Sequence, residues 1–166
     1  VLRDVGLLDE KFWAYCEDTD LGLRAWVAGW ECRFRPNLLV YHARSSTHGD
    51  HSLEKLYLVE RNHYWVMLKN LPLLLVFLSP LLTLHRFFYQ AYIVIAKKGQ
   101  GSAYSNAYPL RTLVAPTLAS LRDAFLGAPA ICIDRLHLLR SRRRGALEVF
   151  FTLVNKRLSL RDLLLK

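Results

Sequence analysis

Two stretches in the first 70 residues repeat apolar side chains with the period of an α-helix. From 17 to 28 the apolar positions recur every three or four residues, acidic residues fill the first turn, and Gly29 follows as a C-terminal cap. Ser52 is a suitable N-cap for a second helix that continues to about Lys69. The pattern therefore predicts two helices in this part of the chain.

The segment between these helices has the pattern of two short strands. Residues 31–35 alternate polar and apolar side chains, Pro36 and Asn37 mark a turn, and 38–41 form a compact apolar run with β-branched and aromatic members. Residues 42–51 are polar. We therefore predict two short strands followed by a loop.

The run from 71 to 96 is long and apolar enough to meet a simple criterion for a transmembrane helix. Ser79 and Pro80 have the chemistry of an N-cap and a first helical position, so a new helix is expected to start there and divide the run. Insertion is one alternative, because fifteen Leu, Ile, Val and Phe residues could outweigh one central Arg. The other is a helix lying in the membrane interface, favoured by a stripe of polar residues at helical spacing: Ser79, Thr83, Arg86, Gln90 and Lys97.

The rest of the chain is predicted to be helical, apolar and basic. A linker rich in Gly, Ser, Asn and Tyr occupies about 97–109. Two helices are expected after it, at 116–125 and 130–144, closed by Gly127 and Gly145.

Composition and charge favour contact with an anionic partner. Apolar residues make up 52% of the chain and charged residues 22%, and 23 Lys and Arg against 14 Asp and Glu give a net charge of +9. Most acidic residues precede position 60, whereas Arg140, Arg142, Arg143 and Arg144 form a basic run. This run fits solvated surface, nucleic acid or anionic lipid; its apolar neighbours favour lipid, and no nucleic-acid-binding motif supports the second class.

Cysteine usage and the start of the chain add little about function. Three widely spaced cysteines have neither the spacing of a zinc site nor the density of a disulfide scaffold, so reduced thiols are expected. The chain begins at Val1 without an initiator methionine or a signal-peptide pattern, and we expect a chain that is incomplete at its N-terminus.

Acidic residues gather where the first predicted helix begins. Glu17, Asp18 and Asp20 can complement the helix dipole, and Asp20 can pair with Arg24 four residues on. The same position would expose a carboxylate to a substrate while backbone donors hold it, as a general base requires. Spacing alone favours the structural role.

The aromatic residues before this cluster and the histidines after it also allow alternatives. Phe12, Trp13 and Tyr15 could stack on a bound ligand or pack in the core beside the helix. His42 follows the second predicted strand and would ordinarily be a hydrogen-bonded loop histidine. A zinc site formed with His48 and His51 is a further alternative, which the lack of a suitably spaced cysteine disfavours.

The most specific pattern in the chain is LDEKFWAYCEDTDLGLR at 8–24, followed by a Gly, a Pro and an apolar run that ends in His42. It resembles the C-terminal part of the catalytic domain in glycosyltransferase family 2, especially in rhamnosyltransferase-like members. Their pattern is G-x-x-D-E-x-F-F-x-Y-x-E-D-x-D-L-x-x-R, and Trp13 replaces one Phe here. The resemblance therefore rests on one long motif rather than on scattered residues.

The resemblance covers residues 1–72 firmly and the rest only in general character. It implies an α/β fold: 1–72 would be the C-terminal, acceptor-side part of a GT-A (Rossmann-like) domain, and 73–166 a mainly α-helical, basic, membrane-associating extension. Arg61-Asn62 and Lys69 also match residues commonly found after the last strand.

The same resemblance implies a reaction and its residues. A sugar would pass with inversion from a nucleotide-sugar donor to a glycan or lipid-linked acceptor, as in the synthesis of bacterial cell-surface polysaccharides. Asp18 falls where these enzymes place the general base, and His42 falls where a residue often contributes to a Mg²⁺ or Mn²⁺ site. Acceptor contacts are expected from Trp13, Tyr15 and Glu17, with support from Asp20 and Arg24.

The family places its Asp-x-Asp cation motif and nucleotide pocket upstream, so this chain alone is expected to be inactive. The expected location is the cytoplasmic face of the plasma membrane, as a peripheral or monotopic protein that contacts the membrane surface and no nucleic acid. Two other classes stay open: a non-catalytic membrane-associated interaction module and a basic nucleic-acid-binding protein.

Overall fold

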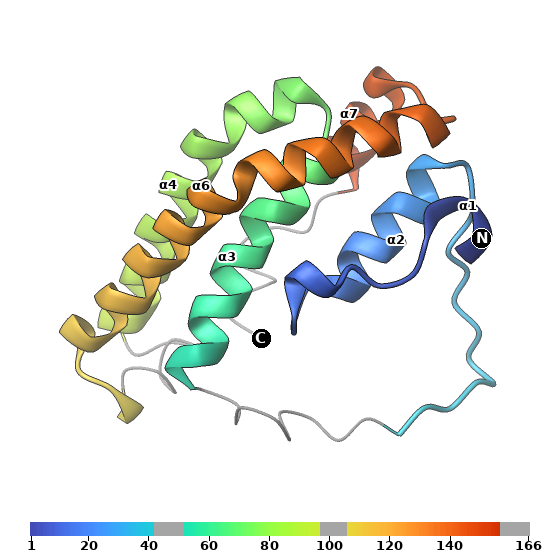
Figure 1. Cartoon of the computed structure of the whole chain (residues 1–166). Helices are drawn as coiled ribbons and strands as arrows, with labels where there is room; N and C mark the ends of the chain where they lie inside the picture. Colours follow the sequence, from blue (N-terminus) through green and yellow to red (C-terminus); the bar gives the residue numbers. More distant parts are fainter. Residues whose placement is uncertain (42–51, 97–105, 157–166) are drawn as a thin grey trace.

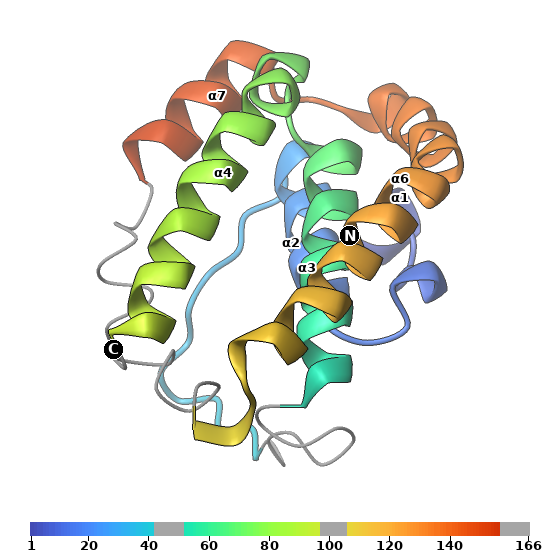
Figure 2. The same cartoon turned by 90° about the vertical axis from the view of Figure 1, so that its left-hand side faces the viewer.

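Helices pack around one central helix, α3 (Figures 1 and 2). The computed structural model describes residues 1–41, 52–96 and 106–156. In chain order the elements are α1 (Leu2–Val5), the 3₁₀ turn η1 (Glu10–Phe12), α2 (Glu17–Val27), α3 (Leu53–Asn70), α4 (Leu73–Ile95), α6 (Leu110–Ser141) and α7 (Ala146–Asn155). The most extensive contact joins α3 to α6, and α3 also contacts α2 and α4. Residues on both sides of position 72 thus share one core.

The predicted α/β, Rossmann-like fold is wrong for the part of the chain that the structure describes, which is all-α. The segments 31–35 and 38–41 are irregular and form no ladder with another described segment. The turn between them is present, because Leu38 N donates to Arg35 O at 3.2 Å. The apolar run at 38–41 is exposed. A strand is stable only when a neighbour satisfies its backbone groups, and sequence alternation cannot supply that neighbour.

The two helices predicted in the first 70 residues are confirmed. Gly29 follows α2 with φ 93°, a left-handed conformation that glycine adopts without strain. Ser52 caps α3, and its Oγ accepts a hydrogen bond from Lys55 N at 3.1 Å. Local capping chemistry therefore set these boundaries. The predicted loop at 42–51 lies outside the described residues.

The predicted break at Ser79 is absent, because α4 runs through Pro80 as one helix that begins after Pro72. Proline has no N–H to offer the carbonyl of Val76, four residues earlier. The Ser79 hydroxyl donates to that Val76 oxygen at 2.6 Å instead. The serine before this proline therefore satisfies a carbonyl inside a continuous helix and does not start a new helix.

The predicted break at Gly127 is also wrong, since α6 continues from Leu110 to Ser141 with Gly127 and Pro129 inside it. Gly127 lies against the indole of Trp65 on α3, where an added Cβ would come within 2.5 Å of Trp65 Cζ2. Trp65 Nε1 donates to Ala124 O at 3.2 Å. The glycine lets two helices approach closely, and the core that results contains Phe12, Trp65, Val66, Ala124 and Ile131.

The face of α4 that carries the predicted polar stripe is turned toward the protein. Arg86 forms two hydrogen bonds with the buried carboxylate of Glu60 on α3, at 2.7 and 2.6 Å. Ser79, Thr83 and Gln90 are half-buried, and Lys97 lies outside the described residues. Apart from His85, the large exposed side chains of α4 are apolar or aromatic: Leu73, Leu74, Phe77, Leu78, Leu81, Leu82, Leu84, Phe88, Tyr92 and Ile95. By length and composition this helix could cross a membrane, with a mean hydropathy of 1.3 over its most apolar window.

Candidate functional site

The segment that leads into α2 has an unusual backbone. Trp13, Tyr15 and Cys16 all have positive φ, at 64°, 68° and 65°. Ala14 N donates to Phe12 O at 2.8 Å across Trp13, whose ψ is −68°. The φ and ψ of Trp13 are those of the strained form of the γ-turn. Each non-glycine residue held in such a sparsely populated conformation lowers the stability of the fold by roughly 1–3 kcal/mol. Local preference alone would not select this turn.

A buried asparagine on α3 holds the turn. The Nδ2 atom of Asn62 lies 2.9 Å from Phe12 O, 2.8 Å from Ala14 O and 2.8 Å from Tyr15 O. A primary amide has two hydrogens, so at least one is shared between carbonyls. Arg61 adds a fourth contact, from Nη2 to Phe12 O at 3.2 Å. The turn is therefore fastened to α3, which itself packs against α2, α4 and α6.

The turn leads directly to the predicted base and acceptor-binding residues. Trp13 is 77% exposed, and Lys55 Nζ lies 5.6 Å from the ring centroid of Tyr15. Glu17 is half-buried, and its Oε2 has no hydrogen-bond partner among the described residues. Asp18 is exposed in the first turn of α2. The sequence-predicted residues thus lie together along one short segment.

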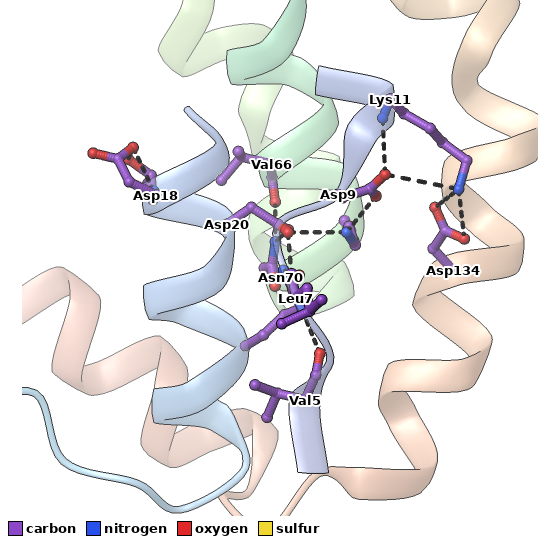
Figure 3. A network of polar contacts seen from close by, with 12 residues as sticks. Val5, Leu7, Asp9, Lys11, Asp18, Asp20, Val66, Asn70 and Asp134 are labelled. Carbon is purple, nitrogen blue, oxygen red and sulfur yellow. Dashed lines mark hydrogen bonds and ion pairs between the residues drawn. The ribbon is translucent and has the colours of Figure 1, made fainter. Parts of the chain in front are cut away.

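Asp18 keeps its carboxylate free of contacts with other elements in the described structure. Its Oδ1 accepts from Thr19 N at 2.6 Å and from Thr19 Oγ1 at 3.3 Å. Figure 3 shows the side chain pointing away from Asp20 and from the ion pairs beside it. Asp18 lines neither the narrow hollow beside Arg24 nor the shallow recess beside Asp9. The chain thus presents the carboxylate to solvent and does not itself enclose it.

Asp20, two residues later, is fully buried and has three partners (Figure 3). Its Oδ2 accepts from Arg24 Nε at 2.7 Å and from Lys69 Nζ at 3.0 Å, and its Oδ1 accepts from Asn70 Nδ2 at 2.8 Å. The predicted Asp20–Arg24 pair is therefore present. Lys69 Nζ also donates to Asp9 Oδ2 at 2.7 Å. We call Asp9, Asp20, Arg24, Lys69 and Asn70 the buried ion cluster.

The buried ion cluster ties α2, α3 and the N-terminal segment together. Arg24 also donates to the carbonyl oxygens of Val5 and Leu7, the latter at 2.7 Å. Burial raises the pKa of Asp9, but hydrogen bonds from the Lys69 ammonium and the Lys11 backbone, with the charges of both lysines, bring the pKa below its ordinary value. The charged form of the Asp9 carboxylate is thus the stable one near neutral pH.

The basic run fixes the other end of α2. The backbone N–H groups of Arg143 and Arg144 both donate to Val27 O at 3.1 Å. Arg144 Nε donates to Trp26 O at 2.8 Å, and its guanidinium lies 5.2 Å from the Trp26 ring centroid. Donors and positive charge at a helix C-terminus satisfy its last carbonyls and complement its dipole. Part of the run predicted to meet lipid therefore has a structural role, while the side chains of Arg140 and Arg143 stay exposed.

The predicted metal ligand His42 lies outside the described residues, as do His48 and His51 of the alternative zinc site. Within the described ranges, no three His, Cys, Asp or Glu side chains come together as a metal-ligand set. The Mg²⁺ or Mn²⁺ ion stays a prediction.

Sequence reasoning missed how much of this arrangement depends on α3. It noted Asn62 and Lys69 only as matches to a family pattern and did not assign a contact to Asn70 or Asp9. Polar residues at 62, 69 and 70 recur with helical spacing among apolar neighbours, and such buried amides and ammoniums require partners. That spacing was the available signal.

Comparison with family models, with curated proteins and with solved structures gave no match for this chain.

Proposed function

We propose that this chain supplies the acceptor side of an inverting, nucleotide-sugar-dependent glycosyltransferase, with Asp18 as the general base. The Asp18 carboxylate would take the proton of an acceptor hydroxyl while that oxygen forms a bond to the anomeric carbon of the donor sugar. The bond from that carbon to the nucleoside diphosphate breaks in the same displacement, which inverts the anomeric configuration. The motif at 8–24 carries the resemblance on which this reaction rests.

One observation supports Asp18 over its neighbours as the base. Asp20 is fully buried among cationic and amide partners, and the partly buried Asp9 is paired with Lys69, so both carboxylates are less accessible and more firmly paired than that of Asp18. Asp18 is exposed at the start of a helix that is held at both ends, by Asn62 and by the basic run. A base needs an accessible carboxylate in a fixed position, and Asp18 combines these properties.

The surroundings of the turn suit a sugar acceptor. Trp13 presents an exposed aromatic face within five residues of Asp18, and aromatic rings pack well against the apolar faces of sugars. Tyr15 and Glu17 lie between them in the chain. We propose that these side chains bind the acceptor beside the base.

A membrane surface is the proposed partner, and a lipid-linked glycan is the proposed acceptor. Apart from His85, the exposed side chains of α4 are apolar or aromatic, while its arginine is paired on the inward face with Glu60. Such a helix places hydrocarbon toward lipid and polar groups toward protein. Docking at the cytoplasmic face of the plasma membrane, as a peripheral or monotopic protein, would hold Asp18 near a substrate confined to the bilayer.

The test is transfer by the full-length protein with Asp18→Asn. We expect kcat to fall by about 100-fold or more, because a general base contributes about 10²–10⁴. Circular dichroism and nucleotide-sugar binding should stay unchanged, since among the described residues Asp18 forms hydrogen bonds with Thr19 alone. Glu10→Gln, which removes another exposed carboxylate from the same segment, is the matched control and should retain activity.

The second candidate is a non-catalytic membrane-associated interaction module. The observation in its favour is that Asp18 lines neither of the two hollows closest to the buried ion cluster. Unchanged turnover in Asp18→Asn would remove this residue from the mechanism. Vesicle binding without any sugar transfer by the full-length protein would favour the module.

A further inference from the structure

The turn at 13–16 needs support from outside its own sequence. It contains three non-glycine residues with positive φ, two of them consecutive, and its γ-turn at Trp13 is the rare, strained form. None of these is Asn or Asp, the residues that tolerate the left-handed region best after glycine. Such a backbone persists only where the surrounding structure determines it.

Asn62 provides that support through a geometry that few side chains can reproduce. The Asn62 side chain is fully buried, and its amide nitrogen reaches the carbonyl oxygens of Phe12, Ala14 and Tyr15. These carbonyls converge because the backbone reverses direction at the turn. An aspartate would present oxygen to oxygen, and a leucine would leave the carbonyls without donors.

We infer that Asn62 is a positioning residue, which fixes the turn at 13–16 and thereby sets the place of Asp18 relative to the acceptor. This inference rests on the proposed glycosyl transfer for its catalytic consequence. Asn62 itself is fully buried, so it acts through the turn. The chain from Asn62 to Asp18 is short, because Tyr15 O is the carbonyl only three residues before the base.

The inference predicts a particular kinetic signature for Asn62→Ala in the full-length protein. We expect kcat to fall by about 100-fold and the KM for the acceptor to rise, because displacement of a base by about 1 Å has an effect of this size. The KM for the nucleotide sugar should not change, since the turn carries only proposed acceptor contacts. A general loss of folded protein would instead lower the amount of active enzyme and leave both KM values unchanged.

A second measurement does not depend on activity. Amide hydrogen exchange in the peptide covering 13–18 should become about tenfold faster in Asn62→Ala, because the carbonyls lose their donors and the left-handed turn opens. Exchange in the central part of α6 should change less. Unchanged exchange at 13–18 would overturn the inference even if the enzyme were inactive for another reason.

Glycine substitution offers a test by rescue. Cys16 lies at the N-cap of α2 with φ 65° and ψ −1°, a conformation that glycine adopts at no steric cost. Adding Cys16→Gly to Asn62→Ala should restore about tenfold of the lost kcat, because the turn then needs less support. Ala14→Gly is the matched control within the same turn; Ala14 has no positive φ, and glycine there should not restore kcat.

The outcomes separate this inference from the proposed function. Faster exchange, a selective acceptor defect and rescue by Cys16→Gly alone would support the positioning role. Normal kcat in Asn62→Ala, or equal rescue at positions 14 and 16, would overturn it. No transfer by the unsubstituted full-length protein would overturn the proposed function and the catalytic part of the inference, whereas the exchange result would still decide whether Asn62 holds the turn.

Discussion

The interface between α2 and α3 is built from charged and polar groups, whereas the outward face of α4 is mainly apolar, with His85 as an exception. At the first, Asp20, Lys69 and Asn70 are buried and fully paired. At the second, Phe77 and Leu81 are exposed and contact little. A water-soluble domain usually has the reverse arrangement, with apolar groups inside and charges outside.

The two regions suit different roles: the buried contacts between α2 and α3 fix a position, and the outward face of α4 suits docking. Paired charges in a low-dielectric interior tolerate little displacement, so the buried ion cluster and Asn62 fix where α2 lies. Apolar contact is not directional, so the face of α4 suits a fluid partner such as lipid. We expect the first region to control stability and catalysis and the second to control location.

The largest expected effect comes from breaking the buried ion cluster with Lys69→Met. Removal of one partner from a buried pair lowers the free energy of unfolding by about 3–5 kcal/mol, because Asp9 and Asp20 lose a shared cation. Lys11→Met is the control. Lys11 is 46% exposed and pairs with Asp134, and an exposed pair contributes about 0–1 kcal/mol. Guanidinium denaturation measures the stability of both variants. Equal midpoints for Lys69→Met and Lys11→Met would contradict the prediction that the buried pair contributes more than the exposed one.

The second prediction concerns the outward face of α4. Replacing Phe77 and Leu81 by serine should weaken binding to phospholipid vesicles by about 100-fold or more, because burying each large apolar side chain contributes about 1.5–3 kcal/mol. The free energy of unfolding in water should change little, since both side chains are already exposed. Cosedimentation with vesicles measures the first quantity. Unchanged binding would assign this face to another partner.

Local chemistry made some elements predictable and left others out of reach. Ser52 and Gly29 mark helix ends through capping geometry that a few residues determine, and both predictions hold. Pro80 and Gly127 have the same local chemistry as a helix start and a helix end, yet both lie inside helices. Gly127 lies inside a helix because of its tertiary contact with Trp65, whereas Pro80 is accommodated by a local hydrogen bond from Ser79 to Val76 in the same helix.

The candidate site divides in the same way. The Asp20–Arg24 pair could be predicted because the partners are four residues apart on one helix. Asn62 contacts Tyr15, and Lys69 contacts Asp20. The residues of each pair are separated by about 50 positions in the chain, and no local pattern predicts such a contact. The strands at 31–35 and 38–41 failed for a related reason, since pairing is also a non-local property.

The third prediction compares two glycines inside helices. Gly127→Ala should lower the free energy of unfolding by about 1–3 kcal/mol, because the new methyl group would overlap the Trp65 ring. Gly22→Ala should raise it by about 0.5–1 kcal/mol, because Gly22 is within α2 and nothing lies within 4 Å of the added Cβ. Thermal denaturation of the two variants tests this. Stabilisation by both would show that α6 and α3 are not in close contact.

The smallest expected effect is a pH dependence of stability that arises from His63 on α3, close to the Glu60–Arg86 pair between α3 and α4. Burial and the nearby Arg86 charge lower the pKa of His63, although Glu60 opposes the shift. The unfolded chain therefore takes up a proton first as the pH falls below the ordinary value of 6.5, and the free energy of unfolding decreases from there toward the lowered pKa. For one group the free energy of unfolding cannot change by more than about 1.4 kcal/mol per pH unit.

Urea denaturation over about two pH units, from roughly pH 7.5 to 5.5, measures this decrease. We expect it in the unsubstituted protein and a smaller decrease in His63→Gln. His137→Gln, on the exposed side of α6, is the control with the same chemical change. An unchanged pH dependence in His63→Gln would contradict this prediction. It would show that other titrating groups cause the decrease, and that the Glu60–Arg86 pair between α3 and α4 does not control the titration of His63.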